Sequence, residues 1–304
     1  MEQIKPSLLF TSYPHEALAQ ELACHSSLEC RTFLLDHFPN QELCLALSTS
    51  VANRNCVILG SLTPPEIHLV TFLMLCHTLK KDKAKQVSAC IPYLAYSRHE
   101  KDEPQKSQMT ALVGALLKAA GLDSILTLDL HNPKKKDLFP IPIHSISPAK
   151  LFAEEIRRLA LTEATIVAPD KGAIARCEDL AQELEKKENL IWIEKMRDQK
   201  NIFHYDLRFG VKKQALIVDD ILDTGQTLIS CCEKLVEKGA QEMVVMITHG
   251  LFTGEKWKEL FDIGVTKIYC TDSVPLSSKL QNDPRIQVLS VAPLLLEALS
   301  IYSP

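Results

Sequence analysis

The sequence lacks any paired-cysteine signature. Its ten cysteines are scattered as single residues, apart from the adjacent Cys231 and Cys232, and no CxxC motif occurs. This spacing predicts neither a disulfide framework nor a zinc site. Cys56, Cys76 and Cys90 fall within apolar runs, where a free thiol behaves as a small core residue. We therefore expect free thiols and a reducing compartment.

The sequence also has little net charge and no long apolar run. The formal net charge is -4, so there is no general basic field to attract nucleic acid. No stretch approaches the roughly 20 apolar residues that a bilayer-spanning helix needs, and the apolar stretch near the N-terminus is too short for a signal peptide. We expect a cytoplasmic protein that binds neither nucleic acid nor membranes and holds anionic ligands by local groups.

Short apolar segments alternate with longer helical patterns along the 304 residues, a length sufficient for two domains. Several of the apolar segments suit strands buried on both faces, as in a parallel sheet covered on each side. This alternation predicts an α/β fold with mostly parallel strands. The predicted strands are residues 56–59, 87–94, 124–130, 164–168, 216–219, 243–248 and 267–270. The predicted helices are residues 65–80, 108–120, 148–159, 174–186 and 227–238.

The most informative segment is residues 216–227, which read LIVDDILDTGQT. An apolar strand leads to Asp219 and Asp220, and a turn with Gly225 and Thr227 precedes an amphipathic helix. Backbone N–H groups at a helix N-terminus have no partners within the helix, and the helix dipole adds partial positive charge there. A phosphate satisfies both. The segment therefore predicts a phosphate-binding turn.

The two carboxylates of this segment fit a sugar phosphate. They accept hydrogen bonds from sugar hydroxyls or hold a water on a divalent cation. The alternative interpretation is an ordinary strand–turn–helix corner with capping threonines. An adjacent acidic pair at the end of a buried strand is costly without a ligand, which favours the binding site.

Two acidic residues, a spacer and T-G-x-T resemble the 5-phosphoribosyl-diphosphate motif of type I phosphoribosyltransferases and of ribose-phosphate diphosphokinases. The rest of the chain resembles the diphosphokinases, with further matching stretches in the same order over nearly its whole length. These stretches are HFPNQE at residues 37–42, IPYLAYSRHEK at 91–101, LTLDLH at 126–131, APDKGA at 168–173, EKMR at 194–197 and THGLFTG at 248–254. The resemblance implies transfer of the terminal diphosphate of ATP to ribose 5-phosphate, with Mg²⁺ as cofactor.

The resemblance also implies two similar phosphoribosyltransferase-like domains, each a mostly parallel sheet flanked by helices. Prolines cluster at residues 141–148, and we place the boundary there. We expect an N-terminal domain at residues 1–147, joined by a C-terminal helix at 292–304, and a C-terminal domain at 148–291. The first domain would carry the adenine loops and the second the ribose 5-phosphate loop.

The resemblance assigns roles to individual residues of this chain. Lys195 and Arg197, in a polar loop after the apolar residues 191–193, match the catalytic lysine and arginine; read alone, such a charge run is solvated surface. The residues implied for ribose 5-phosphate are Asp219, Asp220, Asp223, Thr224, Gly225, Gln226 and Thr227. Those implied for ATP are Phe38, Asn40, Gln41, Glu42, Arg98 and His99.

The metal ligands come partly from spacing and partly from the resemblance. Asp129 and His131 are two residues apart at a predicted strand end, so both side chains would project to one face, where they suit a cation. The resemblance assigns His131 and Asp170 as magnesium ligands, with Asp129 as a secondary candidate. Read alone, His131 is a capping or core histidine, and Asp170 caps a helix that begins near Ile174.

The chain departs from the family pattern in its nucleotide and sugar loops. Asn40 and Gln41 replace the usual Asp-Gly, His99 and Glu100 replace Gln and Asp, and Gln226 replaces a common Gly. These changes keep hydrogen-bonding groups and alter charge, so they leave the nucleotide preference open.

The resemblance also implies an assembly, and two alternative functions can be weighed against it. The family's adenine loop reaches a neighbouring subunit, which implies a homo-oligomer, at least a dimer. A type I phosphoribosyltransferase would use the same phosphate loop without an ATP site. An inactive regulatory subunit of the diphosphokinase would depart from the family at the phosphate loop or the basic loop, whereas both match here.

Overall fold

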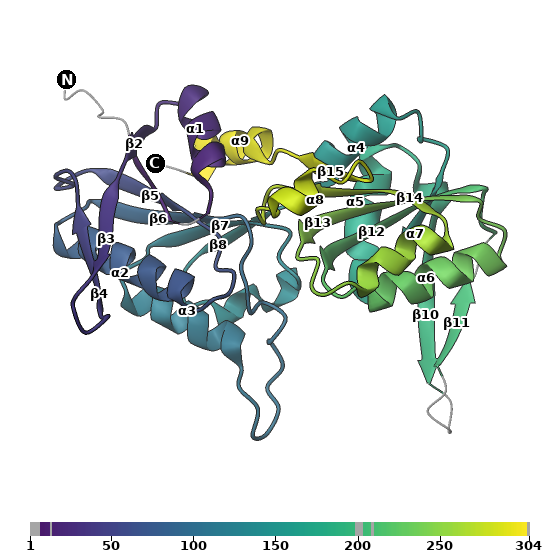
Figure 1. The fold of residues 1–304 in the computed structure, drawn as a ribbon, viewed down its shortest axis with the longest axis horizontal. Coiled ribbons are helices and arrows are strands. Elements are labelled where there is room, and N and C mark those ends of the chain that lie inside the picture. The colour runs from purple at the N-terminus through teal and green to yellow at the C-terminus, as the bar shows by residue number, and fades with distance from the viewer. Residues whose placement is uncertain (1–6, 13, 198–202, 208–209, 303–304) are drawn as a thin grey trace. The chain divides into compact units, whose positions relative to one another are not determined.

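The computed structural model describes residues 7–12, 14–197, 203–207 and 210–302, with the backbone alone at residues 188, 194–197, 203–207 and 302. The chain divides into two compact units (Figure 1). Unit 1 is Met1–Ile146 with Ala292–Pro304, and unit 2 is Ser147–Val291. Each unit holds a mostly parallel sheet with helices, which confirms the predicted α/β fold. None of the described helices has both the length and the apolar character needed to cross a bilayer.

Unit 1 is built on a six-stranded sheet in which every pairing is parallel. Its central strands are buried on both faces, as the apolar runs predict. Helices α1 and α9 contact one another, as do α2 and α3, and Figure 1 shows the two pairs on opposite sides of the sheet. The strand order is β2 (Glu29–Arg31), β1 (Leu8–Thr11), β5 (Asn55–Leu59), β6 (Gln86–Ile91), β7 (Ser124–Leu128) and β8 (Ile143–Ile146). The helices are α1 (Glu16–Cys24), α2 (Ile67–Lys81), α3 (Met109–Ala119) and α9 (Ala292–Tyr302), with a 3₁₀ turn η1 (Pro133–Leu138).

A separate antiparallel hairpin belongs to unit 1. Strands β3 (Phe33–His37) and β4 (Leu43–Leu47) pair with each other, and β4 packs against α2. The residues between the two strands are the predicted adenine loop. The hairpin therefore presents that loop at its tip.

Unit 2 is built on a seven-stranded sheet that is parallel except for one edge strand. Strand β11 pairs antiparallel with β10 and forms a hairpin with it. The strand order is β11 (Phe203–Leu207), β10 (Leu190–Arg197), β9 (Thr165–Ala168), β12 (Gln214–Leu222), β13 (Glu242–Gly250), β14 (Val265–Thr271) and β15 (Ile286–Leu289). The helices are α4 (Ala149–Arg158), α5 (Ile174–Glu183), α6 (Gln226–Glu237), α7 (Glu259–Ile263) and α8 (Ser278–Gln281), with 3₁₀ turns η2 (Lys171–Ala173), η3 (Lys187–Asn189) and η4 (Lys256–Lys258).

The sheet of unit 2 has a hydrophobic core on each face. Strand β12 alternates between them: Leu216 and Val218 pack with α4 and α5, whereas Ile217 packs with α6. Both faces are therefore covered, and the polar residues inside β12 lie toward its carboxyl end. That end carries the acidic pair.

The cysteines lie where the apolar runs predict. All ten are free thiols, and Cys56, Cys76 and Cys90 are fully buried. Burial raises the pKa of the Cys56 thiol to about 11 and that of Cys90 to about 12. These thiols are therefore neutral core groups.

Candidate active site

The predicted sugar-phosphate corner of unit 2, residues 219–227, has the geometry of an anion site. Strand β12 ends at Leu222, and α6 begins at Gln226 after a turn centred on Gly225. Within the described residues, the first α6 amide that bonds to this turn is that of Ile229, which donates to the Gly225 carbonyl at 2.9 Å. The earlier amides of the helix therefore remain for a ligand.

Gly225 itself meets two constraints. Its φ is +85°, in the left-handed region, and a Cβ at this position would lie 2.8 Å from the Cα of Trp257. Trp257 is buried, and its indole N–H donates to the Gly254 carbonyl at 3.1 Å. The segment THGLFTG, together with the residues that follow it, thus supports the phosphate turn from within unit 2.

The acidic pair is held by a cation that the sequence interpretation did not include. Arg176 on α5 places Nη1 3.3 Å from Asp219 Oδ1 and Nη2 3.4 Å from Asp220 Oδ2. Burial raises the pKa of Asp219 well above its usual range, the charge of Asp220 adds to the rise, and Arg176 opposes it. The contact joins residues 43 positions apart, so no local pattern points to it.

Asp170 lies on the neighbouring strand end. Its Oδ1 accepts hydrogen bonds from the amides of Gly172 at 2.8 Å and Ala173 at 3.2 Å, which makes it the N-cap of η2. The capping role predicted from the sequence alone is therefore present. Within the described part of the chain no hydrogen bond engages Oδ2, so the second carboxylate oxygen remains for a ligand.

The strand order of unit 2 brings three predicted segments to one edge. Strands β10, β9 and β12 are adjacent and parallel, so their carboxyl ends meet at the same side of the sheet. These ends carry residues 194–197, Asp170 and the segment 219–227.

One local prediction about these segments is wrong. Lys195 and Arg197 do not lie in a loop but in β10, opposite Tyr205 and Phe203 of β11. The antiparallel pairing with β11 extends the strand through the charged residues, and a partner strand cannot be read from the charge run. The side chains of Lys195 and Arg197 lie outside the described part of the structure.

In unit 1 the predicted nucleotide loop and metal loop contact each other. Arg98 and His99 follow β6 and are exposed. Glu100 comes next, and its Oε1 accepts a hydrogen bond from the Nδ2 of Asn132 at 2.8 Å. Since Asn132 directly follows His131, this bond ties the segment after β6 to the segment after β7.

The predicted arrangement of Asp129 and His131 is wrong in one respect. Strand β7 ends at Leu128, and Asp129 has a left-handed backbone with φ +43°. Alternation of side chains applies only inside a strand, so the two-residue spacing does not place these side chains on one face. Asp129 instead turns the chain, with its amide bonded to the Ile146 carbonyl at 2.8 Å.

The predicted adenine loop closes the β3–β4 hairpin. The Phe38 amide donates to the Glu42 carbonyl at 2.8 Å, and Asn40 Oδ1 accepts from the Glu42 amide at 3.2 Å. Phe38 is 53% exposed, so it is not the core residue that its type alone suggests. The loop presents an aromatic ring and an acidic side chain at an exposed tip.

Family models match two parts of the chain. Residues 7–121 match the N-terminal domain of ribose phosphate pyrophosphokinase, and residues 209–302 match the phosphoribosyl synthetase-associated domain. A ribose-phosphate pyrophosphokinase of Caldanaerobacter subterraneus is 31% identical over 296 residues, covering 96% of this chain and 93% of the relative. The chain belongs to the ribose-phosphate pyrophosphokinase family. Ribose-phosphate pyrophosphokinase A of Dictyostelium discoideum is 29% identical over 96% of this chain and 93% of that protein.

A solved structure of this family has the same fold. The phosphoribosylpyrophosphate synthetase of Mycobacterium smegmatis superposes with a TM-score of 0.86 at 26% identity, covering 97% of this chain and 98% of that one. The relatives span the middle of the chain that neither family model matches. That middle part carries His131, Asp170, Lys195 and Arg197.

One departure from the family pattern has a visible backbone basis. Gln41, for which the resemblance implies glycine, has a φ of +70°. A left-handed residue costs about 1–2 kcal/mol for a residue with a Cβ. Gln41 therefore adopts the left-handed turn at the cost of this strain.

The donor set for a metal is sparse. Within the described ranges, no group of three or more His, Cys, Asp or Glu side chains is arranged to hold a metal ion. Mg²⁺ retains several waters and binds substrate phosphates, so it needs only one or two protein donors. The unengaged Oδ2 of Asp170 therefore fits this ion.

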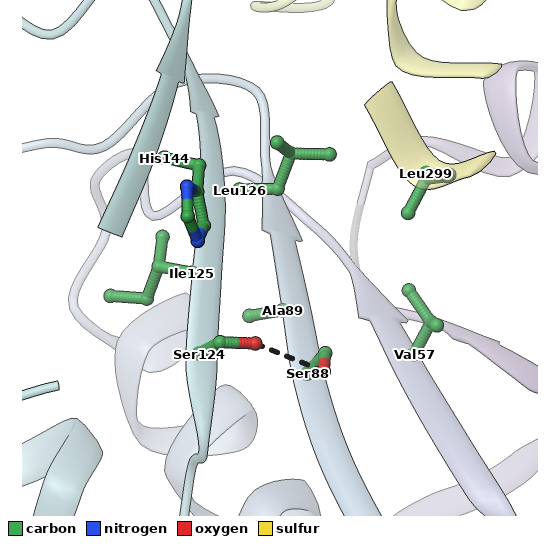
Figure 2. Close-up of a pocket in the computed structure, with 8 residues that line it drawn as sticks. All are labelled: Val57, Ser88, Ala89, Ser124, Ile125, Leu126, His144 and Leu299. Atoms are coloured by element: carbon green, nitrogen blue, oxygen red, sulfur yellow. Dashed lines mark hydrogen bonds between the residues drawn. The ribbon is translucent and has the colours of Figure 1, made fainter. Parts of the chain in front are cut away.

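A hollow in unit 1 lies apart from these loops. It is lined by residues of β5, β6, β7, β8 and α9. Ser124 Oγ donates to Ser88 Oγ at 3.1 Å, and Figure 2 shows this bond among the lining residues. His144 and Leu299 border it. None of the predicted site residues lines this hollow.

Proposed function

We propose that this chain transfers the terminal diphosphate of ATP to the anomeric hydroxyl of ribose 5-phosphate, releasing AMP and 5-phosphoribosyl 1-diphosphate. One observation supports this above all: an acidic pair at the carboxyl end of β12 runs directly into the N-terminus of α6. That corner offers amides for a phosphate and carboxylates for sugar hydroxyls. Membership of the family supplies the reaction class.

The sugar substrate is assigned to unit 2. Its 5-phosphate would accept hydrogen bonds from the amides and hydroxyls of residues 223–227, including Thr224, Gln226 and Thr227. Its ring hydroxyls would donate to Asp219 and Asp220. The anomeric hydroxyl is then left free to attack.

The nucleotide is assigned to unit 1. Arg98 and His99 would bind its phosphates and base, and the hairpin tip of residues 38–42 would contact the adenine through the Phe38 ring. Arginine suits this role because its guanidinium binds phosphate by two parallel hydrogen bonds. The two units thus divide the two substrates between them.

Lys195 and Arg197 are assigned to the transition state. In-line attack on the β-phosphorus moves negative charge onto the oxygen that leaves with AMP. Two fixed cations that meet this charge lower the barrier, because catalysis of phosphoryl transfer rests on positioning and charge neutralisation. No covalent enzyme intermediate is needed.

Mg²⁺, when bound, would neutralise the ATP phosphates, with His131 and Asp170 as protein donors and Asp129 as a secondary one. We also propose a homo-oligomer in which a second copy covers the β3–β4 hairpin. Leu34 and Leu35 on that hairpin are 63% and 38% exposed, which suits a protein interface better than free solvent. Ten free thiols suit the cytoplasm.

The test is a product analysis. The purified chain is incubated with Mg-ATP and ribose 5-phosphate, and nucleotides and sugar phosphates are resolved by anion-exchange chromatography and ³¹P NMR. AMP and the sugar diphosphate should appear in equal amounts. Release of ADP, or consumption of the sugar diphosphate with a nucleobase and no reaction with ATP, would refute the proposal.

A further inference from the structure

Arg176 is a buried cation that faces both acidic side chains of the sugar corner. It lies on the first turn of α5, and its side chain is 9% exposed, against 12% for Asp219 and 6% for Asp220. One guanidinium nitrogen meets each carboxylate. The two contacts therefore fix two side chains with one group.

The same guanidinium reaches the neighbouring loop. Arg176 Nη1 also donates to the carbonyl oxygen of Gly172 at 3.3 Å, within the turn that Asp170 caps. Asp219 Oδ1 additionally accepts from the Asp220 amide at 2.9 Å. These bonds leave the acidic pair little freedom to rotate.

Two adjacent carboxylates repel each other unless a cation stands between them. Without Arg176, each would turn away from its neighbour or toward water, and a buried charge without a partner is strongly unfavourable. With it, the remaining carboxylate oxygens keep fixed directions. Fixed directions are what two neighbouring sugar hydroxyls require of their acceptors.

We propose that Arg176 is a positioning residue that aims Asp219 and Asp220 at the 2- and 3-hydroxyls of the sugar, and so sets selectivity for ribose 5-phosphate over 2-deoxyribose 5-phosphate. The inference rests on the proposed function, because it takes the acidic pair as the hydroxyl acceptor. It adds a residue and a specificity to that site. Arg176 itself touches neither substrate.

The planar fork of arginine is needed here. A lysine at this position keeps the charge but is a point donor that cannot meet two carboxylates in parallel. We therefore expect Arg176→Lys to retain part of the selectivity. Arg176→Met, which has no charge, should retain none.

The experiment measures binding rather than turnover. Isothermal titration with Mg²⁺ present gives the affinities of both sugar phosphates for the wild type, Arg176→Lys, Arg176→Met and the control Arg158→Met. Arg158 is exposed and pairs with Glu155 on α4. Circular dichroism melts report whether each variant folds.

The wild type should bind ribose 5-phosphate roughly 10- to 100-fold more tightly than the 2-deoxy sugar, the worth of one hydrogen bond to a charged acceptor. In Arg176→Met this ratio should fall to about 1, because ribose 5-phosphate alone loses the bond to its 2-hydroxyl. Both sugars should lose the bond to the 3-hydroxyl and keep their phosphate contacts, so the affinity for ribose 5-phosphate should fall more than that for the 2-deoxy sugar. Arg176→Lys should lie between, and Arg158→Met should match the wild type.

Two results would overturn the inference. One is a wild-type ratio in both Arg176 variants. The other is an equal loss of affinity for both sugars, which indicates a purely structural role. If Arg176→Met fails to fold, the ratio in Arg176→Lys decides. A wild type that shows the selectivity but yields no AMP with ATP contradicts the proposed reaction and leaves the role of Arg176 standing.

Discussion

At position 225 both the backbone conformation and the neighbouring atoms require glycine. A left-handed φ of +85° disfavours any side chain, and the Cα of Trp257 occupies the space that a Cβ would need. The motif T-G-x-T is thus explained at this position by geometry. Gly239 offers a comparison, because its φ is +97° and no atom lies within 4 Å of a Cβ built there.

Gly225→Ala should lower the free energy of unfolding by more than Gly239→Ala does. Both variants incur the strain of a left-handed alanine, about 1–2 kcal/mol, but only the first must also displace the backbone of Trp257. Urea denaturation measures the difference, and titration with ribose 5-phosphate should show lost binding in Gly225→Ala alone. Equal stabilities and affinities in the two variants would contradict this account of the turn.

Lys195→Ala should lower kcat by about 10²–10³-fold, the usual loss when one preorganised charge donor is removed from a transition state. The affinity for ribose 5-phosphate should stay unchanged, because the sugar is assigned to other groups. AMP formation and sugar titration measure the two quantities. Lys279→Ala, on the exposed face of α8, is the control. Wild-type turnover in Lys195→Ala would refute the assignment of β10 to catalysis.

The turn from β1 into α1 is held by a buried histidine. His15 Nε2 lies 2.8 Å from Ser61 Oγ, which also accepts the Tyr93 amide at 3.0 Å. Burial lowers the pKa of His15 to about 4. The bonds connect the segments that follow β1, β5 and β6, so this turn stabilises the edge of unit 1 that carries the predicted nucleotide loop.

The stability of this turn should depend on pH. In the unfolded chain His15 takes up a proton near pH 6.5, whereas in the folded chain it resists protonation until about pH 4. As the pH falls from 6.5 toward 4, the unfolded chain takes up a proton at His15 and the folded chain does not. The folded protein should therefore lose up to ~3 kcal/mol of stability over this range. Denaturation curves at several pH values, compared with His15→Gln, measure this term. Parallel pH profiles for the two proteins would contradict it.

The β3–β4 hairpin is the element on which the proposed assembly depends. Leu34→Asp should dissociate the oligomer, because a charge cannot be buried in an apolar interface without a partner. The KM for ATP should then rise, since the adenine site would be incomplete. Sedimentation velocity and steady-state kinetics measure the two effects. Ile301→Asp, at a 67% exposed apolar residue of α9, is the control, and an unchanged assembly in Leu34→Asp would contradict the proposal.

Across the whole molecule, the sequence predicts those helices and strands that have a clear local pattern of apolar residues. The long apolar strands and the amphipathic helices are confirmed, because burial on both faces and a 3.6-residue period are visible in the sequence. The sequence does not predict strands β1, β2, β3, β4, β8, β10, β11 and β15. Strands β2, β8, β11 and β15 lie at sheet edges and pair on one side only, and β10 continues into charged residues, whereas β1 is a short buried strand inside its sheet.

In the candidate site, too, some features follow from local sequence and others depend on long-range packing. The turn at Gly225 and the cap at Asp170 follow from local residue types, and the order of strands brings them together. The left-handed turn at Asp129 breaks the side-chain alternation that the two-residue spacing of Asp129 and His131 predicts. The contact of Arg176 with Asp219 depends on the packing of α5 against β12, which no local pattern encodes.

The central claim is that the chain moves an intact diphosphate by attack on the β-phosphorus. ATP labelled with ³²P at the β-position tests it most directly, with ribose 5-phosphate and Mg²⁺ present and the products separated by chromatography. The account predicts that all transferred label is in the sugar 1-diphosphate and that AMP is unlabelled. Label retained in ADP would contradict it.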